Sequence, residues 1–229
     1  KTIKVSSPEA AEATKLMENI FRAVNIAMVN ELKLIFERMN INIWEVIDAA
    51  DSKPFGFMPF YPGPGMGGHC IPIDPFYLSW KAKEYNTEAK FIELAGEINR
   101  KMTENIAHRM GKALNDHSKS IRNSNILILG LAYKKDIDDM RESPALKIIE
   151  LLKFKGANIS YHDPYIKNAK KIEYADLSKE NLAKADAVLI ITDHSNVDYE
   201  KVGKYAKLVI DTRNVMASVK NPKAHILRA

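Results

Sequence analysis

Cysteine is almost absent from this sequence: Cys70 is the only one among 229 residues. One cysteine cannot form a disulfide within the chain, so cysteine usage does not point to an oxidising compartment. The sequence also lacks any run of about 20 apolar residues, the length that a membrane-spanning helix needs. The pattern of a secretory signal peptide is missing as well. These absences predict a globular protein of the cytoplasm.

Metal-ligand patterns are missing too. The six histidines show no zinc-ligand spacing, and a single cysteine would leave zinc with an unusual ligand set. We therefore expect no metal site. The formal net charge of +5 suits a phosphate-bearing ligand. The lysines are dispersed, however, and no basic patch is interleaved with stacking aromatics, so nucleic acid is not an expected partner.

A dinucleotide-binding turn is the third absence. The only run of the Gly-x-Gly-x-x-Gly type, Gly63–Gly68, follows no apolar strand and opens no helix. A dinucleotide fingerprint needs both of those neighbours. The sequence therefore offers no recognisable site for the pyrophosphate of a dinucleotide.

The first half of the chain has the period of helices. Apolar residues recur every 3.6 residues from Pro8 to about Arg38, which predicts one helix roughly 45 Å long. Ser6 or Ser7 can cap it, with Pro8 at the first helical position. Parts of this helix are apolar nearly all round, which indicates burial on several sides and favours a subunit interface. Further helices are expected over residues 43–50, 75–85 and 87–116.

The second half changes to short apolar runs. Strands are expected at residues 126–129, 157–161, 187–191 and 208–210, with a helix over 144–155. Strands that alternate with helices predict a parallel sheet covered on both faces. We therefore expect an α/β protein, with an all-helical central domain at residues 1–117 and a Rossmann-like domain at 118–229. Ligands bind such sheets beyond the carboxyl ends of the strands. Polar or glycine-containing segments at such ends are Gly130–Lys134, Asp163, Asp193 and Asp211–Arg213.

Cys70 lies in a setting unusual for a core thiol. It follows a segment rich in glycine and proline, Pro62–Gly68, in which glycine lets a ligand approach the backbone and proline stiffens the chain. The residues alone leave open a structural thiol and a reactive one. Asp74 is either an acid-base partner for the thiol or an N-cap for a helix that begins with Pro75.

Three segments together resemble a known family. Residues 55–78, FGFMPFYPGPGMGGHCIPIDPFYL, resemble the active-site segment of the UDP-glucose/GDP-mannose dehydrogenase superfamily. Residues 12–19 resemble the opening of its central helix. Residues 130–134, 139–144 and 211–214 resemble its C-terminal signatures. The resemblance extends over essentially the whole chain and is strongest to the branch that oxidises UDP-N-acetylhexosamines.

The resemblance implies an NAD-dependent, four-electron oxidation of a primary alcohol to a carboxylic acid. UDP-N-acetylglucosamine is the expected substrate, oxidised at C6 through a thiohemiacetal and a thioester. The alternatives are UDP-N-acetylmannosamine, UDP-glucose, or a non-catalytic fragment that binds nucleotide sugars. UDP-glucose dehydrogenases carry Arg-Ile-Gly where this chain has Lys53–Gly56, and that departure favours an N-acetylated sugar.

The resemblance also implies roles for individual residues. Cys70 is the expected nucleophile. Lys15 and Asn19, four residues apart on one helix face, are expected to stabilise an oxyanion. Asp74 is expected to assist the thiol and the hydrolytic water. The expected substrate-binding residues are Phe60, Tyr61, Gly65, Gly67, Lys134 and Arg213, and Arg141 is expected to contact the dinucleotide.

Two partners follow from the same resemblance. Members of the family begin with an NAD-binding domain, so we interpret this chain as the central and C-terminal parts of a longer enzyme and expect the chain by itself to be inactive. The long helix is expected to form the core of a homodimer.

Overall fold

The computed structural model describes residues 2–229 and divides into two compact units. The first unit contains the chain up to Pro62 together with His69–Arg100. The second contains Gly63–Gly68 and Lys101–Ala229. Residues Gly63–Gly68, here called the glycine-rich loop, therefore belong to the second unit, although Cys70 belongs to the first.

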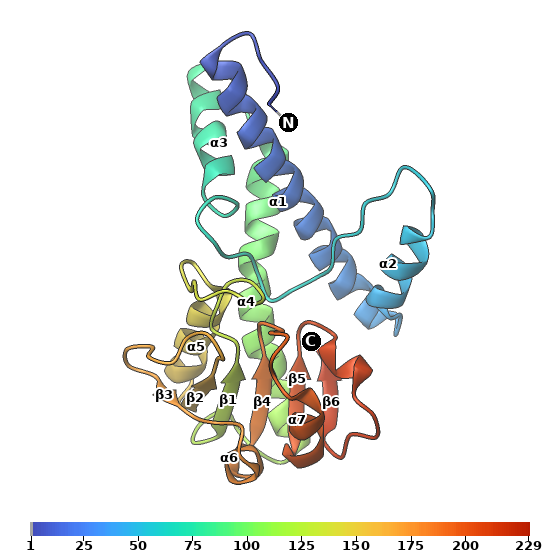
Figure 1. Cartoon of the computed structure of the whole chain (residues 1–229), viewed down its shortest axis with the longest axis vertical. Helices are drawn as coiled ribbons and strands as arrows, with labels where there is room; N and C mark the ends of the chain where they lie inside the picture. Colours follow the sequence, from blue (N-terminus) through green and yellow to red (C-terminus); the bar gives the residue numbers. More distant parts are fainter. Residues whose placement is uncertain (1) are drawn as a thin grey trace. The chain divides into compact units, whose positions relative to one another are not determined.

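The first unit consists of helices. They are α1 (Pro8–Arg38), α2 (Ile43–Asp51), α3 (Asp74–Glu84) and the beginning of α4 (Lys90–Asp116), as Figure 1 shows. The bounds of α1 agree with the apolar period. Its N-cap is Ser7, whose Oγ accepts a hydrogen bond from the backbone N–H of Ala10 at 3.2 Å, and Pro8 opens the helix.

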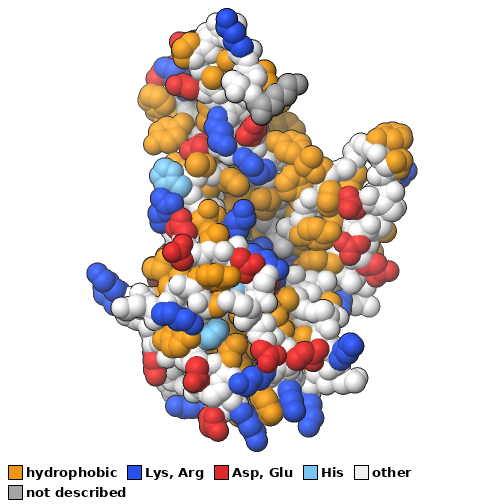
Figure 2. Space-filling view, viewed as in Figure 1, with side chains coloured by type: hydrophobic (Ala, Val, Ile, Leu, Met, Phe, Trp, Pro, Cys, Tyr) orange, Lys and Arg blue, Asp and Glu red, His pale blue; other side chains and the backbone are white. Residues whose placement is uncertain are grey.

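Two kinds of contact hold the first unit together. An apolar cluster joins α1 to α2 through Val29, Ile43, Trp44 and Ile47. Asn99 of α4 bridges α1, because its amide accepts from Asn30 at 2.9 Å and donates to the carbonyl of Ala23 at 3.1 Å. Other apolar side chains remain at the surface of this unit (Figure 2). On α1 they include Met17, Phe21, Met28 and Ile35.

The second unit is built on a sheet of six parallel strands in the order β3-β2-β1-β4-β5-β6. The strands are β1 (Asn125–Leu129), β2 (Asn158–His162), β3 (Glu173–Tyr174), β4 (Ala187–Ile190), β5 (Leu208–Asp211) and β6 (His225–Arg228). The helical domain followed by a Rossmann-like parallel sheet confirms the expected fold class. The two edge strands, β3 and β6, were missed in the sequence.

Helices cover both faces of this sheet. Alternate residues of β1 point to opposite sides, so Ile126 and Ile128 pack in one cluster and Leu127 and Leu129 in the other. The first face is covered by the later part of α4 and by α5 (Pro144–Phe154). The second is covered by α6 (Lys179–Lys184), α7 (Tyr199–Tyr205) and the 3-10 helix η1 (Val215–Ser218).

The carboxyl ends of β1, β4 and β5 meet at one edge of the sheet. At the end of β1, Gly130 has φ +86, and a Cβ there would lie 2.5 Å from the Cβ of Thr192, beyond β4. Only glycine fits that close approach. The loop after β1 is therefore packed directly against the loop after β4, which brings the sequence motifs of both strands together.

No helix among residues 2–229 is long and apolar enough to cross a membrane.

Candidate functional site

Cys70 opens the turn that leads into α3. Its carbonyl accepts hydrogen bonds from the backbone N–H groups of Ile73 at 3.1 Å and Asp74 at 2.8 Å. The thiol is free and exposed. The turn therefore leaves Cys70 accessible to a ligand, as a nucleophile requires.

A polar cluster in the first unit joins α1 to the start of α3. Asn19 is buried, and its amide donates to Asp74 Oδ2 at 2.8 Å while its Oδ1 accepts from Arg22 Nη2 at 2.8 Å. The N-cap interpretation of Asp74 is wrong, because α3 is capped by Ile73 and Asp74 already lies within the helix. Its carboxylate is committed to Asn19 instead of the backbone. Arg22 was not expected here; its place three residues after Asn19 on α1 is the signal that indicates it.

Lys15 lies apart from this cluster. Its ammonium group is 3.5 Å from Glu18, and 59% of its side chain is exposed. The structure therefore pairs Asn19 with Asp74 and Arg22, and leaves Lys15 on the solvent-facing side of α1.

The two aromatic residues expected to line the sugar pocket contact α1 and α2. Phe60 stands edge-on to Phe21, with ring centroids 5.6 Å apart, and packs on the α1–α2 cluster. The hydroxyl of Tyr61 donates to Asp48 at 2.7 Å, and this hydrogen bond raises the pKa of Tyr61. Both side chains are thus held by helices of the first unit.

In the second unit, the glycine-rich loop packs against the strand-end loops, meaning the segments that follow β1 and β5. A Cβ at Gly67 would lie 2.7 Å from the carbonyl oxygen of Glu142 and 2.7 Å from the Cβ of Tyr133. Gly68 lies against the ring of Tyr133 and donates its N–H to the carbonyl of Arg141 at 3.1 Å. The glycines therefore permit close packing of two protein segments. Gly67 is thereby held against the loop after β1, and Gly65 belongs to the same glycine-rich segment.

Arg213 is held at the edge formed by the carboxyl ends of the strands, by the residue that follows β4 and by the glycine-rich loop. Its Nε donates to the carbonyl of Ile191 at 2.8 Å, and its guanidinium lies where a Cβ of Gly63 would fall. Burial lowers the pKa of Arg213, and Asp193 and Asp211 oppose that shift. The structure thus supplies a fixed, partly enclosed cation.

The other two basic residues at this edge differ from Arg213. Lys134 is exposed, next to Tyr133 in the loop after β1. Arg141 forms a two-pronged ion pair with Asp139, with Nη2 2.7 Å from Oδ2. Lys134, Arg141 and Arg213 therefore lie in neighbouring segments of one unit. Arg141 has a close carboxylate partner, and Arg213 has a more distant one, because its Nε lies 4.0 Å from Asp193 Oδ1.

The glycine turns of the described residues do not fit the pyrophosphate of NAD. At the end of β1 the space beside Gly130 is occupied by Thr192. In the glycine-rich loop the space beside Gly67 is occupied by Tyr133 and Glu142. A pyrophosphate needs an open glycine turn at the start of a helix, whereas α5 begins only at Pro144. Among residues 2–229 the structure therefore shows no open glycine turn for the pyrophosphate of a dinucleotide.

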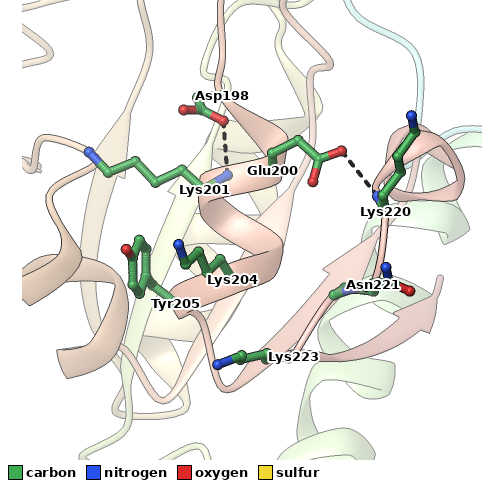
Figure 3. A pocket seen from close by; sticks show the side chains of 9 residues that line it. Asp198, Glu200, Lys201, Lys204, Tyr205, Lys220, Asn221 and Lys223 are labelled. Atoms are coloured by element: carbon green, nitrogen blue, oxygen red, sulfur yellow. Dashed lines mark hydrogen bonds between the residues drawn. The ribbon is translucent and has the colours of Figure 1, made fainter.

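One cavity of about 490 Å³ lies elsewhere on the second unit, between α7 and the segment that leads to β6 (Figure 3). Four lysines line it: Lys201, Lys204, Lys220 and Lys223. It contains none of the expected site residues. In residues 2–229, no three His, Cys, Asp or Glu side chains are grouped to hold a metal ion.

Two models of one protein family match this chain. Residues 9–101 match the central domain of the UDP-glucose/GDP-mannose dehydrogenase family, and residues 127–218 match its UDP binding domain.

Relatives agree with the two models. UDP-N-acetyl-D-mannosamine dehydrogenase of Pyrococcus horikoshii is 36% identical over 219 residues, covering 93% of this chain and 50% of that protein. An NDP-N-acetyl-D-galactosaminuronic acid dehydrogenase structure from Methanosarcina mazei has a TM-score of 0.80 at 31% identity, over 91% of this chain and 48% of its own. A UDP-glucose dehydrogenase structure from Pyrobaculum islandicum has a TM-score of 0.81 at 26% identity, covering 97% and 52%. The chain spans about half the length of these relatives.

Proposed function

Because the chain belongs to the UDP-glucose/GDP-mannose dehydrogenase family, we propose that it carries the catalytic thiol and the UDP-sugar site of a nucleotide-sugar 6-dehydrogenase. One observation supports this most directly. The glycine-rich loop that ends two residues before Cys70 packs on the strand-end loop that carries Tyr133 and Lys134. A substrate held by Lys134 is thereby linked through the chain to the thiol.

The chemistry assigned to Cys70 is covalent. Its sulfur adds to the carbonyl carbon of the intermediate aldehyde, forming a C–S bond while a proton goes to the oxygen. This captures the aldehyde. After oxidation to the thioester, water attacks the carbonyl carbon, the C–S bond breaks and the thiolate leaves. Both oxidation steps need a hydride acceptor. The expected acceptor is NAD, held by a domain outside the described residues.

Asn19 and Lys15 are assigned to the oxyanion that develops on the substrate. Asp74 is assigned to the water that hydrolyses the thioester. The part-buried hydrogen bond between Asn19 of α1 and Asp74 at the start of α3 fixes an amide beside a carboxylate, and Asp74 is four residues after Cys70. A fixed carboxylate can accept a proton from water, and a fixed amide can donate to a developing oxyanion. Lys15, being exposed, supplies positive charge only when substrate brings it inward.

Lys134 and Arg213 are assigned to the uridine diphosphate. Arg213 is already enclosed and fixed, which lowers the entropy lost when it binds an anion. Lys134 is exposed and contributes a mobile ammonium. Arg141, already paired with Asp139, is assigned to the dinucleotide side.

The proposed sugar carries a 2-acetamido group. The segment from Lys53 to Tyr61 is rich in aromatic side chains, which can pack an acetyl methyl. The relative from P. horikoshii is named for UDP-N-acetyl-D-mannosamine, whereas the sequence led us to expect UDP-N-acetylglucosamine. Our proposal is therefore a UDP-N-acetylhexosamine, with the mannosamine and glucosamine epimers as the two candidates.

The proposed assembly is a homodimer that includes an NAD-binding domain. The exposed apolar side chains of α1 support the homodimer. The length of the relatives, about twice that of this chain, supports the additional domain. Light scattering tests the homodimer: we expect twice the mass of one protomer, and the mass of one protomer would contradict it.

Kinetics on the complete enzyme test the sugar. Burial of one methyl is worth about 1 kcal/mol, and an unpaired amide partner costs about 1–3 kcal/mol. Together these predict a kcat/KM for the better acetamido epimer roughly 10²-fold above that for UDP-glucose. Equal or better use of UDP-glucose contradicts the proposal.

Isothermal calorimetry of the 229-residue chain with UDP tests the binding site. We expect UDP to bind, and we expect Lys134→Ala and Arg213→Ala to weaken that binding. We expect no NADH formation by this chain.

A further inference from the structure

Asp163 and His194 are fully buried at the carboxyl ends of β2 and β4. The chemistry assigned above uses neither of them. A carboxylate and an imidazole without solvent are costly unless they are paired and hydrogen-bonded. Their partners therefore indicate what the pair does.

Asp163 holds the beginning of the loop after β1. Its Oδ2 accepts hydrogen bonds from the N–H groups of Leu131 at 2.7 Å and Ala132 at 3.0 Å, and its Oδ1 accepts two more from its own loop. Burial raises the pKa of Asp163, but hydrogen bonds from His194 and from backbone N–H groups outweigh it. The pKa is lowered as a net result. The group is thus a carboxylate committed to this loop.

His194 holds the end of the same loop. Its Nδ1 accepts a hydrogen bond from the N–H of Asp136 at 3.0 Å, and its Nε2 lies 3.1 Å from Asp163 Oδ2. A nitrogen that accepts from an N–H has no proton, so the proton of a neutral ring is on Nε2, where it donates to Asp163. One imidazole therefore connects the two ends of the loop.

The segment after β4 adds two more attachments. Thr192 Oγ1 donates to the carbonyl of Ala132 at 2.6 Å. Ser195 donates to the carboxylate of Asp136 through its N–H at 2.8 Å and its Oγ at 2.7 Å. Ala132 and Asp136 are thus fixed on either side of Lys134, while the side chain of Lys134 is exposed.

We infer that Asp163 and His194 are positioning residues, which fix the loop of residues 130–136 so that Lys134 is presented to the phosphates of the nucleotide sugar. This inference rests on the proposed function for the role of Lys134. The attachment of the loop is a separate claim, which can be measured without any ligand. Preorganisation of this kind raises affinity because the loop loses less conformational entropy on binding.

Two variants of His194 separate positioning from bulk stability. In His194→Asn the amide oxygen can take the place of Nδ1 and keep the Asp136 N–H bonded, while the contact with Asp163 is lost. In His194→Gln the amide nitrogen can take the place of Nε2 and keep Asp163 bonded, while Asp136 is released. The probe is UDP, titrated into the 229-residue chain, and hydrogen exchange at the Asp136 amide is followed by NMR.

We expect His194→Gln to weaken UDP binding at least 10-fold and to speed exchange at Asp136 at least 10-fold. His194→Asn should stay within about threefold of the unchanged chain in both measurements. Ser178→Ala is the stability control, because it removes the N-cap of α6 and should leave UDP affinity unchanged. The inference is overturned if His194→Gln leaves Asp136 exchange unchanged, or if it speeds exchange without weakening UDP binding in a chain that Lys134→Ala does weaken.

If Lys134→Ala leaves UDP affinity unchanged, the contact assigned to Lys134 is wrong and the presentation of Lys134 falls with it. Exchange at Asp136 then still decides whether the pair holds the loop. Should both histidine variants fail to fold, ¹⁵N chemical shifts of the unchanged chain decide. A proton on Nε2 supports the geometry, and a proton on Nδ1 overturns it.

Discussion

Gly67→Ala tests whether the glycine-rich loop must pack on the strand-end loops. The added Cβ lies 2.7 Å from the carbonyl oxygen of Glu142 and from the Cβ of Tyr133, each 0.7 Å short of ordinary contact at 3.4 Å. Neither atom is the end of a flexible side chain. Forcing this fit costs about 1–3 kcal/mol. Undocking the loop instead loses the hydrogen bond from Gly68 to Arg141, worth about 1 kcal/mol.

Either response displaces the segment that leads to Cys70. A misplacement of about 1 Å can cost about 10²-fold in rate, so we expect kcat/KM of the complete enzyme to fall at least that far. Urea unfolding should show a loss of only about 1–3 kcal/mol. Gly156→Ala is the matched control: it introduces strain at φ +88 far from the loop, costing about 1 kcal/mol, and should leave kcat/KM unchanged. Unchanged kcat/KM in Gly67→Ala would show that catalysis does not depend on the docking of this loop.

Two further predictions concern buried polar groups. Hydrogen bonds lower the folded-state pKa of Asp163 below its unfolded value of about 3.9. The carboxylate therefore stabilises the fold fully above the unfolded pKa, and this stabilisation is lost as pH falls through the folded pKa. Asp163→Asn should therefore cost about 3 kcal/mol at pH 7 and less at pH 3 in urea unfolding, and a pH-independent difference contradicts this. Asn19→Ala removes the partner of Asp74 and should lower kcat of the complete enzyme at least 10-fold while leaving the UDP affinity of the chain unchanged. Weaker UDP binding with normal kcat contradicts the role assigned to Asn19.

Local patterns predicted most of the fold. The 3.6-residue period and the Ser7-Pro8 start defined α1 because helix boundaries depend on neighbouring residues. The central strands were found because burial on both faces leaves continuous apolar runs. β6 was missed because it is an edge strand, and its exposed ends, His225 and Arg228, interrupt the apolar pattern.

Contacts between distant segments were beyond the sequence. Asn19 and Asp74 are 55 residues apart, and no local period relates them. Gly67 was expected to admit substrate, whereas its neighbours are Tyr133 and Glu142. His194 was set aside for lacking metal-ligand spacing. Its bond to Asp163, from another strand end, depends on the order of strands in the sheet.

Whether Cys70 is the nucleophile is tested most directly by the yield of uronic acid from the complete enzyme and from its Cys70→Ser variant, with NADH counted in the same samples. We expect two NADH per acid in the unchanged enzyme, because the alcohol is oxidised twice. In the variant we expect acid production to fall by about 10³-fold or more, a typical loss for a covalent catalyst. Near-normal acid production by Cys70→Ser would contradict the assignment of the thiol.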